Sequence, residues 1–495
     1  MSERVGTWES AGSSNFIDGS WQASDDEATA ANINPARNDD LIGSFTRGSV
    51  ASLDRAVAAA SAAAEAWAAT SPVLRARLLT AIARMIERNA EEFARDLSRE
   101  EGKTLREAQA EVRRGIHVFD FYAGAGHRLG GRLHPSERPG FRIENRRVSL
   151  GVVAAITPWN FPFAIPAWKV APALIAGNAV VLKPASLTPM SAVNLARAAE
   201  AAGLPPGILN LVHGDGATLG AAIAAHPGIA AISFTGSTEV GRKLFRAASD
   251  VFKPVQTEMG GHNPLVILAD ADLDDAVAIA VDGAFMSTGQ KCTATRRILV
   301  EDAAYEPFLE RLVAAATALR LGDPLETTTQ IGPVISAEQL ALDEAGVQGA
   351  VAEGARLAAG GHIRDGGPLS RGWFYAPTVL TDVKRDAQIA QKEVFGPIVS
   401  IFRVGGLDEA IELANGTEYG LSASICTRDL VAAERFVRAS RSGVVAVNAA
   451  TAGIEVQAPL HGTKASGLGP PEQGDEAIEF FTEPKSVYLR TPGLS

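Results

Sequence analysis

Short apolar runs alternate with longer amphipathic stretches from Val148 onward, and this alternation constrains the fold more than any other feature of the chain. The runs VSLGVVAAI, AVVLKP, GILNLV and AAISFTG have the length and composition of strands, and the segments between them have a helical pattern. Strands and helices in alternation predict a parallel, doubly wound sheet. A second alternating region begins near Leu265 and ends with GVVAVN at 443–448, which predicts another α/β unit.

Two other regions have a different pattern. Residues 52–124 carry apolar side chains at three- and four-residue intervals, which predicts amphipathic helices. The segment GGRLHPSERPGFRIENRRV is polar and rich in turn residues, and AIEFFTEPKSVYLR near the C-terminus is strand-like. We expect a projecting hairpin and an edge strand that could meet another subunit.

Composition limits the possible partners. The chain has 495 residues, 46% of them apolar, which suits about three folding units. Its net charge is −11 and both signs are interspersed, so we expect small-molecule partners and neither nucleic acid nor a membrane surface. The first residues, MSERVGTWESAGSSN, lack the apolar core of a signal peptide, and no stretch reaches the ~18 apolar residues of a membrane span. A cytoplasmic location is therefore expected.

The chain has only two cysteines, Cys292 and Cys426, too few for a disulfide framework and better suited to a reducing compartment. Neither HExxH nor CxxC occurs, so we expect no catalytic metal.

Cys292 stands in FMSTGQKCTATRR, after a helical stretch and before the strand-like RRILV. A turn there can direct the thiol into a cleft beside its own backbone N–H. Surrounding positive charge would increase the thiolate fraction of a thiol whose ordinary pKa is about 8.5. Lys291 could supply some of this charge, although its side chain is expected to point away. A lone cysteine can also be an inert buried residue, and Cys426 is interpreted in that way.

Glycines occur where one predicted strand gives way to a helix. In AAISFTGSTEVGRKLF, backbone N–H groups around Gly236 and Gly241 can hold a pyrophosphate, although the spacing also suits a tight turn. Lys183 and Ser186 end the strand VVLKPAS, where such sheets commonly meet a ribose. Lys183 can equally be an ordinary solvated lysine.

Two further motifs follow predicted strands. In PWNFP, the amide of Asn160 can donate to a developing oxyanion, although the motif can also be a proline-bounded turn. In QTEMGGHNP, Glu258 precedes two glycines and can be a general base or a structural carboxylate.

Taken together, PWNFP, FTGSTEVG, EMGGHNP, GQKC and KEVFGPI, in this order over residues 158–398, resemble the aldehyde dehydrogenase superfamily. The similarity extends from FIDGSW to EFFTEPKSVY. PAWKVAPAL, GQKCTAT and PEQG are most similar to bacterial members such as α-ketoglutaric semialdehyde dehydrogenases.

The resemblance implies an α/β fold with a Rossmann-like cofactor domain, a second α/β catalytic domain and a small β oligomerisation hairpin. The domains would comprise residues 1–129 and 149–258 for the cofactor, 259–460 for catalysis, and 130–148 with 476–490 for oligomerisation. It also implies a homodimer or homotetramer.

The resemblance implies the following catalytic roles. Cys292 attacks the aldehyde, Asn160 and the Cys292 backbone N–H stabilise the oxyanion, and Glu258 activates water to hydrolyse the thioester. Lys169 and Glu472 match positions associated with proton transfer and the water route, and can equally form a structural ion pair.

The cofactor implied is NAD or NADP. Glu393 would hold the nicotinamide ribose, Phe395 would pack near the ring and Ser237 would contact the pyrophosphate. The full set of cofactor candidates is Thr157, Trp159, Lys183, Ser186, Gly216, Phe234, Gly236, Ser237, Met259, Glu393 and Phe395.

Several positions depart from the family pattern. Many relatives have an acid where Ser186 stands, which predicts use of NADP as well as NAD. His262 replaces a usual lysine, and Leu460 with His461 replaces the more familiar Phe-Gly.

A tunnel walled by Trp159, Phe161, Trp168 and Leu460 would favour aromatic or medium-length aldehydes. A substrate carboxylate could instead meet Arg296 or His461.

The predicted function is NAD(P)-dependent oxidation of an aldehyde to a carboxylic acid through a cysteine thiohemiacetal and a thioester. A coenzyme A-acylating semialdehyde dehydrogenase is one alternative, although acyl transfer to a thiol needs no water-activating Glu258. A catalytically retired structural or binding protein is the other, although the nucleophile, the amide and the base are all present.

Overall fold

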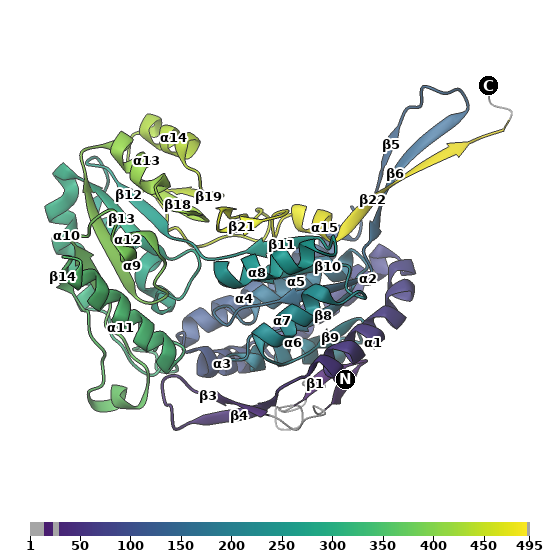
Figure 1. Ribbon diagram of the computed structural model, residues 1–495, viewed down its shortest axis with the longest axis horizontal. Coiled ribbons are helices and arrows are strands. Elements are labelled where there is room, and N and C mark those ends of the chain that lie inside the picture. Colours follow the sequence, from purple (N-terminus) through teal and green to yellow (C-terminus); the bar gives the residue numbers. More distant parts are fainter. Residues whose placement is uncertain (1–13, 23–28, 493–495) are drawn as a thin grey trace.

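The computed structural model describes residues 14–22 and 29–492, so residues 1–13, which carry most of the N-terminal segment considered above, lie outside it. Two separate α/β units, each with helices on both faces of a sheet, form the body, and a narrow three-stranded sheet projects from one of them (Figure 1). The predicted fold class is confirmed.

The first unit is built on an eight-stranded sheet. Its five central strands are parallel, as the alternating pattern predicts, and the edge strands are antiparallel. The strands in spatial order are β2 (Ser20–Gln22), β1 (Asn15–Ile17), β9 (Leu209–Leu211), β8 (Ala179–Lys183), β7 (Val152–Ile156), β10 (Ala231–Thr235), β11 (Val255–Glu258) and β21 (Gly467–Leu468).

Helices cover both faces of this sheet. The helices on one face are α1 (Val50–Ala69), α7 (Gly216–Ala225) and α8 (Thr238–Ser249), and those on the other are α2 (Pro72–Arg88), α3 (Ala90–Glu101), α4 (Leu105–Ala125), α5 (Ala164–Ile175) and α6 (Pro189–Ala201). Successive side chains of a strand point to opposite faces of the sheet. Val152 and Ala154 therefore pack in the core under α1, α7 and α8, whereas Val153 and Ala155 pack in the core under the helices of the other face. This explains why the strands are apolar along their whole length.

The second unit has a seven-stranded sheet, parallel except at β14. Its strands in spatial order are β14 (Arg356–Ala359), β15 (Thr378–Thr381), β16 (Ile398–Val404), β13 (Thr295–Glu301), β12 (Asn263–Ile267), β18 (Ser422–Cys426) and β19 (Val444–Val447). Its helices are α9 (Leu273–Phe285) and α10 (Asp302–Thr317) on one face, and α11 (Ala337–Ala352), α12 (Gln388–Gln391), α13 (Leu407–Asn415) and α14 (Leu430–Ala439) on the other.

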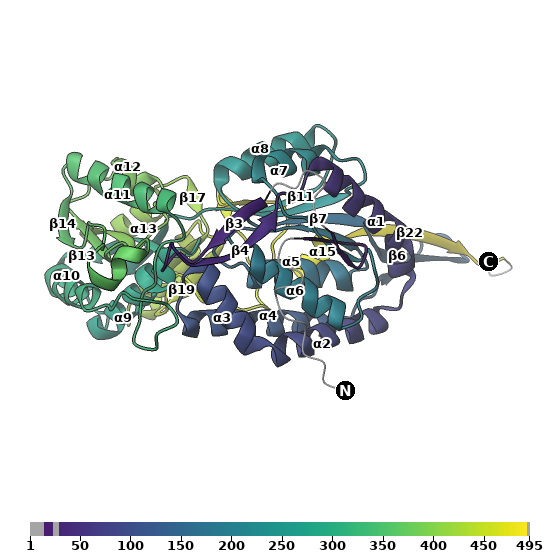
Figure 2. The same ribbon diagram turned by 90° about the horizontal axis from the view of Figure 1, so that it is seen from below.

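The projecting sheet consists of β5 (Arg132–His134), β6 (Phe141–Ser149) and β22 (Thr482–Arg490). Its antiparallel strands extend away from the body in both views (Figures 1 and 2). Two details differ from the expectation. The run VSLGVVAAI is two strands, because Gly151 at φ +109° breaks it between β6 and β7. Residues 476–480 of the predicted edge segment form helix α15 (Glu476–Phe480).

The remaining short elements are the strands β3 (Thr29–Ile33), β4 (Leu41–Thr46), β17 (Tyr419–Gly420) and β20 (Thr463–Lys464), and the 3-10 turns η2 (Met286–Gly289) and η3 (Gly367–Arg371). Within the described ranges, no helix is both long and apolar enough to cross a membrane.

The candidate residues are brought together by the ends of strands. The PWNFP loop follows β7, Glu258 ends β11, and Cys292 lies between the turn η2 and β13. Because neighbouring parallel strands end at the same edge of a sheet, the loops after β7 and β10 and the end of β11 share one edge.

A close backbone contact supports the turn before Cys292. A Cβ atom on Gly332 would lie 1.8 Å from the carbonyl oxygen of Gly102, which leaves no room for a side chain. The carbonyl of Gly332 accepts a 3.1 Å hydrogen bond from the hydroxyl of Thr288 in η2. This glycine therefore links the end of α3 to the turn that carries the cysteine.

We predict that Gly332→Ala lowers the free energy of unfolding by about 1–3 kcal/mol, the usual cost of overpacking, and reduces activity by displacing η2. Gly349→Ala is the control, because a Cβ there meets nothing within 4 Å in the interior of α11. It should raise the free energy of unfolding by about 0.4–1 kcal/mol. Urea and thermal unfolding measure both effects, and equal stability of the two variants would contradict this account.

Candidate active site

A cavity of about 490 Å³ brings the candidate residues of several segments together. All eleven cofactor candidates line it, from Thr157 after β7 to Phe395 in the second unit, and both Asn160 and Cys292 line it as well. The ring of Trp159 packs edge-on against Phe395 at 5.4 Å between centroids, which connects the two units across the cavity.

The nucleotide-binding candidates lie at the start of helix α8. Ser237 caps this helix by accepting a hydrogen bond from the N–H of Val240. A Cβ on Gly236 would lie 2.6 Å from the ring of Phe234, so glycine is required for this close packing. A helix start beside the cavity provides free N–H groups for a phosphate, and the lining therefore fits a nicotinamide dinucleotide.

Lys183, which also lines the cavity, is buried, and its ammonium donates to the carbonyl of Pro184 at 2.9 Å. Burial lowers the pKa of Lys183 to about 8, against a smaller opposing effect of Asp215. The hydroxyl of Ser186 donates to the carbonyl of Gly214 at 3.1 Å. Ser186 also lines an adjoining hollow of about 210 Å³ together with Arg47.

Cys292 is a half-buried free thiol on the wall of the cavity. Burial, followed by the negative charges of Glu393 and Glu258, raises the pKa of this thiol to about 12. The expectation that positive charge would activate the resting thiol is therefore wrong. Lys291 points away, as expected, and donates to the carbonyl of Asp282 at 2.9 Å.

Arg296, the other nearby cation, is 3% exposed. Its guanidinium donates to the carbonyls of Gly396 at 2.6 Å and Gly289 at 2.5 Å. It links the turn before Cys292 to the segment that carries Phe395 and is not available to a substrate carboxylate, contrary to one of our expectations.

Asn160 has a donor to spare. Its side-chain nitrogen donates to the carbonyl of Gln290 at 3.0 Å. Because an amide nitrogen carries two hydrogens, the second remains available to an oxyanion. Within the described part of the chain, the backbone N–H of Cys292 has no acceptor. The two donors expected of an oxyanion hole are thus both present at the cavity wall.

Buried charges hold the Asn160 loop. The ammonium of Lys103 donates to a carboxylate oxygen of Glu111 and to the carbonyl of Asn160, both at 2.7 Å, and lies 4.1 Å from the centre of the Phe161 ring. The other oxygen of Glu111 accepts from the N–H of Phe163 at 2.9 Å. These contacts fix the loop between β7 and α5.

A neighbouring carboxylate holds the turn before Cys292. Glu107 forms a capping box with Thr104 at the start of α4 and accepts a 2.6 Å hydrogen bond from the N–H of Ser287. Ser287 and Thr288 both have φ +54°, a strained conformation for residues with side chains. Sequence analysis missed Lys103, Glu107 and Glu111. The capping-box spacing T-x-x-E was a signal for α4 alone, and nothing marked the contact of Glu107 with a turn 180 residues away.

Glu258 is buried at the end of β11. The N–H of Gly462 donates to both of its carboxylate oxygens at 3.1 Å, and the Nδ1 atom of His461 lies 3.9 Å from one of them. Burial, with the charge of Glu472 next, raises the pKa of Glu258 well above its ordinary value.

Lys169 and Glu472 form an ion pair behind this carboxylate, and both are almost fully buried. Glu472 also accepts from the indole N–H of Trp168 at 2.8 Å, and Lys169 donates to the hydroxyl of Ser233 at 2.8 Å. Burial lowers the pKa of Lys169, while Glu472 opposes this effect. The structure therefore contains the ion pair, and a part of these residues in proton transfer stays a prediction.

Of the four predicted tunnel residues, Trp159 lines the large cavity, whereas Phe161, Trp168 and Leu460 do not. Phe161 and Trp168 are half-buried, Leu460 is buried, and the N–H of Leu460 donates to the carbonyl of Glu472 at 2.6 Å. His262, the other departure noted above, is buried against the carbonyl of Ile389 at 3.0 Å, and burial lowers its pKa to about 3. A neutral packing role for His262 follows.

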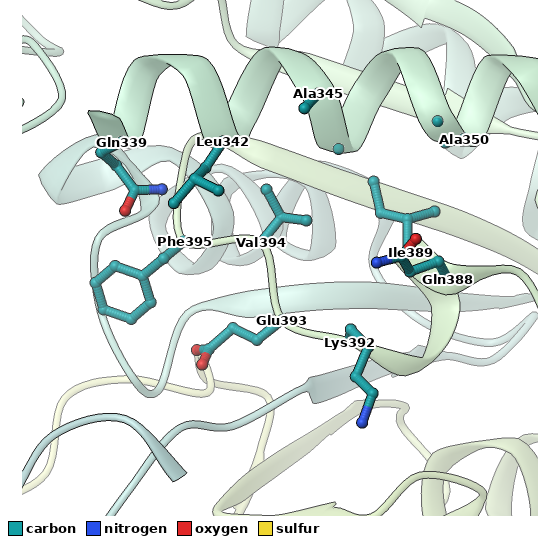
Figure 3. Close-up of a pocket in the computed structure, with 12 residues that line it drawn as sticks. Gln339, Leu342, Ala345, Ala350, Gln388, Ile389, Lys392, Glu393, Val394 and Phe395 are labelled. Carbon is teal, nitrogen blue, oxygen red and sulfur yellow. The ribbon is translucent and has the colours of Figure 1, made fainter. Parts of the chain in front are cut away.

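A second cavity of about 360 Å³ lies between α11 and the segment that carries Glu393 (Figure 3). Figure 3 shows Val394 directed toward α11, whereas Lys392 and Glu393 point away from it. Glu393 and Phe395 line both cavities, so this segment is the wall between them. The N–H of Gly261 donates to Glu393 at 3.4 Å, and burial raises the pKa of Glu393 to about 7, although Arg296 opposes the effect.

Comparison with known proteins agrees with this geometry. The model of the aldehyde dehydrogenase family matches residues 21–487. An alpha-ketoglutaric semialdehyde dehydrogenase of Bacillus subtilis is 40% identical over 476 residues, which covers 96% of this chain and 98% of that protein.

Solved structures agree as well. Betaine aldehyde dehydrogenase from Staphylococcus aureus in complex with NAD+ has a TM-score of 0.96 at 33% identity, covering 98% of this chain and 96% of that one. An NADP dependent enzyme of E. coli has a TM-score of 0.93 at 36% identity, covering 97% and 98%. The chain therefore belongs to the aldehyde dehydrogenase family, and it is an oxidoreductase that uses a nicotinamide cofactor.

Proposed function

We propose that the protein oxidises an aldehyde to a carboxylic acid, with Cys292 as nucleophile, Asn160 and the Cys292 N–H as oxyanion donors, and Glu258 as the base for hydrolysis. One observation carries the proposal. The thiol and a spare amide hydrogen of Asn160 open on the same cavity that all the cofactor candidates line.

The first step is attack of the Cys292 sulfur on the carbonyl carbon, which forms a thiohemiacetal. Because the thiol is protonated at rest, its proton must pass to a water molecule in the cavity as the sulfur attacks. Negative charge then develops on the carbonyl oxygen, where Asn160 and the Cys292 N–H are free to donate. Glu393 and Phe395, which line the cavity, would hold the nicotinamide end of the cofactor, and the cofactor would supply the acceptor for the hydride of this carbon, leaving a thioester on Cys292.

The second step is hydrolysis of the thioester. Water adds to the carbonyl carbon, its proton passes to Glu258, and the carbon–sulfur bond breaks to release the acid. A raised pKa suits Glu258 to this role, because a stronger base removes the proton more readily at neutral pH. Lys169 offsets part of the repulsion between Glu472 and Glu258, and so supports the ionised base.

Both nicotinamides are proposed as cofactors. An acid near the ribose would repel a 2′-phosphate, and Ser186 carries no charge. Lys183 lies close by, and Arg47 lines the adjoining hollow. The similar structures include one complex with NAD+ and one NADP dependent enzyme.

The substrate is proposed to be an aromatic or medium-length aldehyde. Phe161 and Trp168 offer apolar walls, while the charges beside them are already paired, Lys103 with Glu111 and Lys169 with Glu472. The similar proteins are named for a semialdehyde and for betaine aldehyde, so overall identity does not select the substrate. Nothing in these comparisons favours the coenzyme A-acylating or the retired alternative.

We further propose a homodimer or homotetramer, assembled through the projecting sheet. Leu133 and Tyr488 are 73% and 56% exposed on its strands, an apolar surface typical of an interface.

The domain boundaries given above remain our proposal, with β21 added to the cofactor sheet. Two free cysteines suit a reducing compartment such as the cytoplasm.

We predict that Cys292→Ala abolishes oxidation of every aldehyde in a panel followed at the absorbance of the reduced nicotinamide. Cys426→Ala is the matched control, because Cys426 is buried in a core of the second unit and does not line the cavity. It should keep near-normal turnover. Turnover by the Cys292 variant, or its loss in the Cys426 variant, would contradict the proposed nucleophile.

Glu258→Gln should separate the two steps. Rapid mixing is expected to show a burst of reduced nicotinamide close to one per site, followed by turnover roughly 10²–10⁴-fold slower than wild type, the usual cost of a lost general base. Because the carboxylate form of Glu258 increases as pH rises through its raised pKa, wild-type hydrolysis should accelerate with pH, and the variant should lose this dependence. A variant without a burst would place Glu258 in the first step.

The wild-type enzyme should use both NAD and NADP in the same panel. Ser186→Glu should lower kcat/KM for NADP at least about tenfold, a difference of about 1.4 kcal/mol, with little change for NAD. Ser186→Ala adds no charge and should keep the use of NADP. Strict preference of the wild type for NAD would refute the prediction.

A further inference from the structure

His461 is a second ionisable group at the hydrolytic base. Its Nδ1 atom lies 3.9 Å from Glu258, shielded from solvent and without a hydrogen-bond partner among the described residues. The side chain as a whole is nevertheless 34% exposed. The exposed part of the ring therefore lies away from Nδ1, and the imidazole extends from the buried carboxylate to solvent.

Glu258 must lose the proton that it takes from water before it can act again. The carboxyl group is 4% exposed, and the groups behind it, Lys169 and Glu472, are 1% and 2% exposed. Glu472 is surrounded by interior donors, which are Trp168, Lys169, Ser233 and Thr235. Cys292 carries the acyl group at this step, and of the other ionisable side chains described around Glu258, His461 alone has a substantial exposed surface.

We propose that His461 carries this proton from Glu258 to solvent during each hydrolysis. The inference rests on the proposed function of Glu258. The O–H bond of the protonated carboxyl breaks and an N–H bond forms at Nδ1, and the imidazolium then loses a proton to bulk water. A separation of 3.9 Å is too long for a direct hydrogen bond, so the transfer passes through one water molecule or follows a small rotation of Glu258.

The protonation state of His461 permits this role. Burial lowers the pKa of His461, so the ring is neutral and able to accept a proton at neutral pH. The N–H of Gly462, the next residue, holds the carboxylate beside the ring. His461 is thus a positioning residue for the base and an exit for its proton.

The test measures hydrolysis of the acylated enzyme directly, by single turnover, acid quench and mass spectrometry of the Cys292 peptide. His461→Ala should show a burst of reduced nicotinamide, like Glu258→Gln, and should hydrolyse the acyl group roughly 10²-fold more slowly than wild type, at the lower end of what a lost acid–base group costs. Added imidazole should restore the rate in proportion to its unprotonated fraction. His461→Asn should be as slow as the alanine variant, because an amide does not accept a proton at this pH.

His362→Ala is the control, because that histidine is exposed and, among the described residues, the one hydrogen bond of its ring is to the carbonyl of Gly360. It should hydrolyse at the wild-type rate and ignore imidazole. Wild-type rates in both His461 variants would overturn the proposal, and so would a loss that imidazole does not restore. An effect on KM alone, confined to aldehydes that carry a carboxylate, would also overturn it, because His461 would then bind substrate. Failure to find an acyl group on Cys292 in quenched Glu258→Gln enzyme, with any aldehyde that the wild type oxidises, would instead refute the proposed function.

Discussion

The ion pair between Lys103 and Glu111 is the contact on which the site depends. Both side chains are about 1% exposed, and burial of two charges is costly unless every donor and acceptor is used. Here the charges hold the Asn160 carbonyl and the N–H of Phe163. Loss of either partner would leave a buried charge unpaired, which is far more destabilising than loss of an exposed pair. The same ion pair therefore stabilises this region and fixes the position of Asn160.

The active site is rich in carboxylates rather than cations. Glu258, Glu393 and Glu472 all raise the pKa of Cys292, and its thiol is protonated at rest. A protonated thiol is oxidised less readily than a thiolate, because the thiolate is the reactive form. One of these carboxylates, Glu258, is the base that we propose for the later hydrolysis of the thioester. The arrangement thus favours the second step over the activation of the resting nucleophile.

Sequence patterns predicted the fold because the apolar runs of the strands and the amphipathic pattern of the helices both agree with the α/β arrangement. The strand runs of the first unit are apolar on both faces, and the structure buries both faces. The same patterns predicted that Asn160, Glu258 and Cys292 follow strands or turns, and all eleven cofactor candidates line one cavity. Here the chain order of secondary structure was sufficient, because parallel strands end at a shared edge.

The remaining features depend on contacts between distant segments. Neither the pairing of Glu107 with Ser287 nor the burial of Lys103 changes the local pattern of residues, so no period or motif reveals it. The effect of charge on Cys292 was predicted with the wrong sign for the same reason. Lys291 and Arg296 lie close to Cys292 in the sequence, but both donate hydrogen bonds to backbone carbonyl groups. The three carboxylates that raise the pKa of Cys292 come from distant parts of the chain.

The central claim is that Cys292 and Asn160 act on the same carbonyl group. A crystal structure of the Glu258→Gln enzyme, frozen after mixing with NAD and an aldehyde that it oxidises, tests this most directly. The account predicts continuous density from the sulfur of Cys292 to an acyl carbon, with the acyl oxygen within hydrogen-bond distance of the Asn160 side-chain nitrogen. An unmodified Cys292 beside oxidised product, or an acyl oxygen turned away from Asn160, would contradict it.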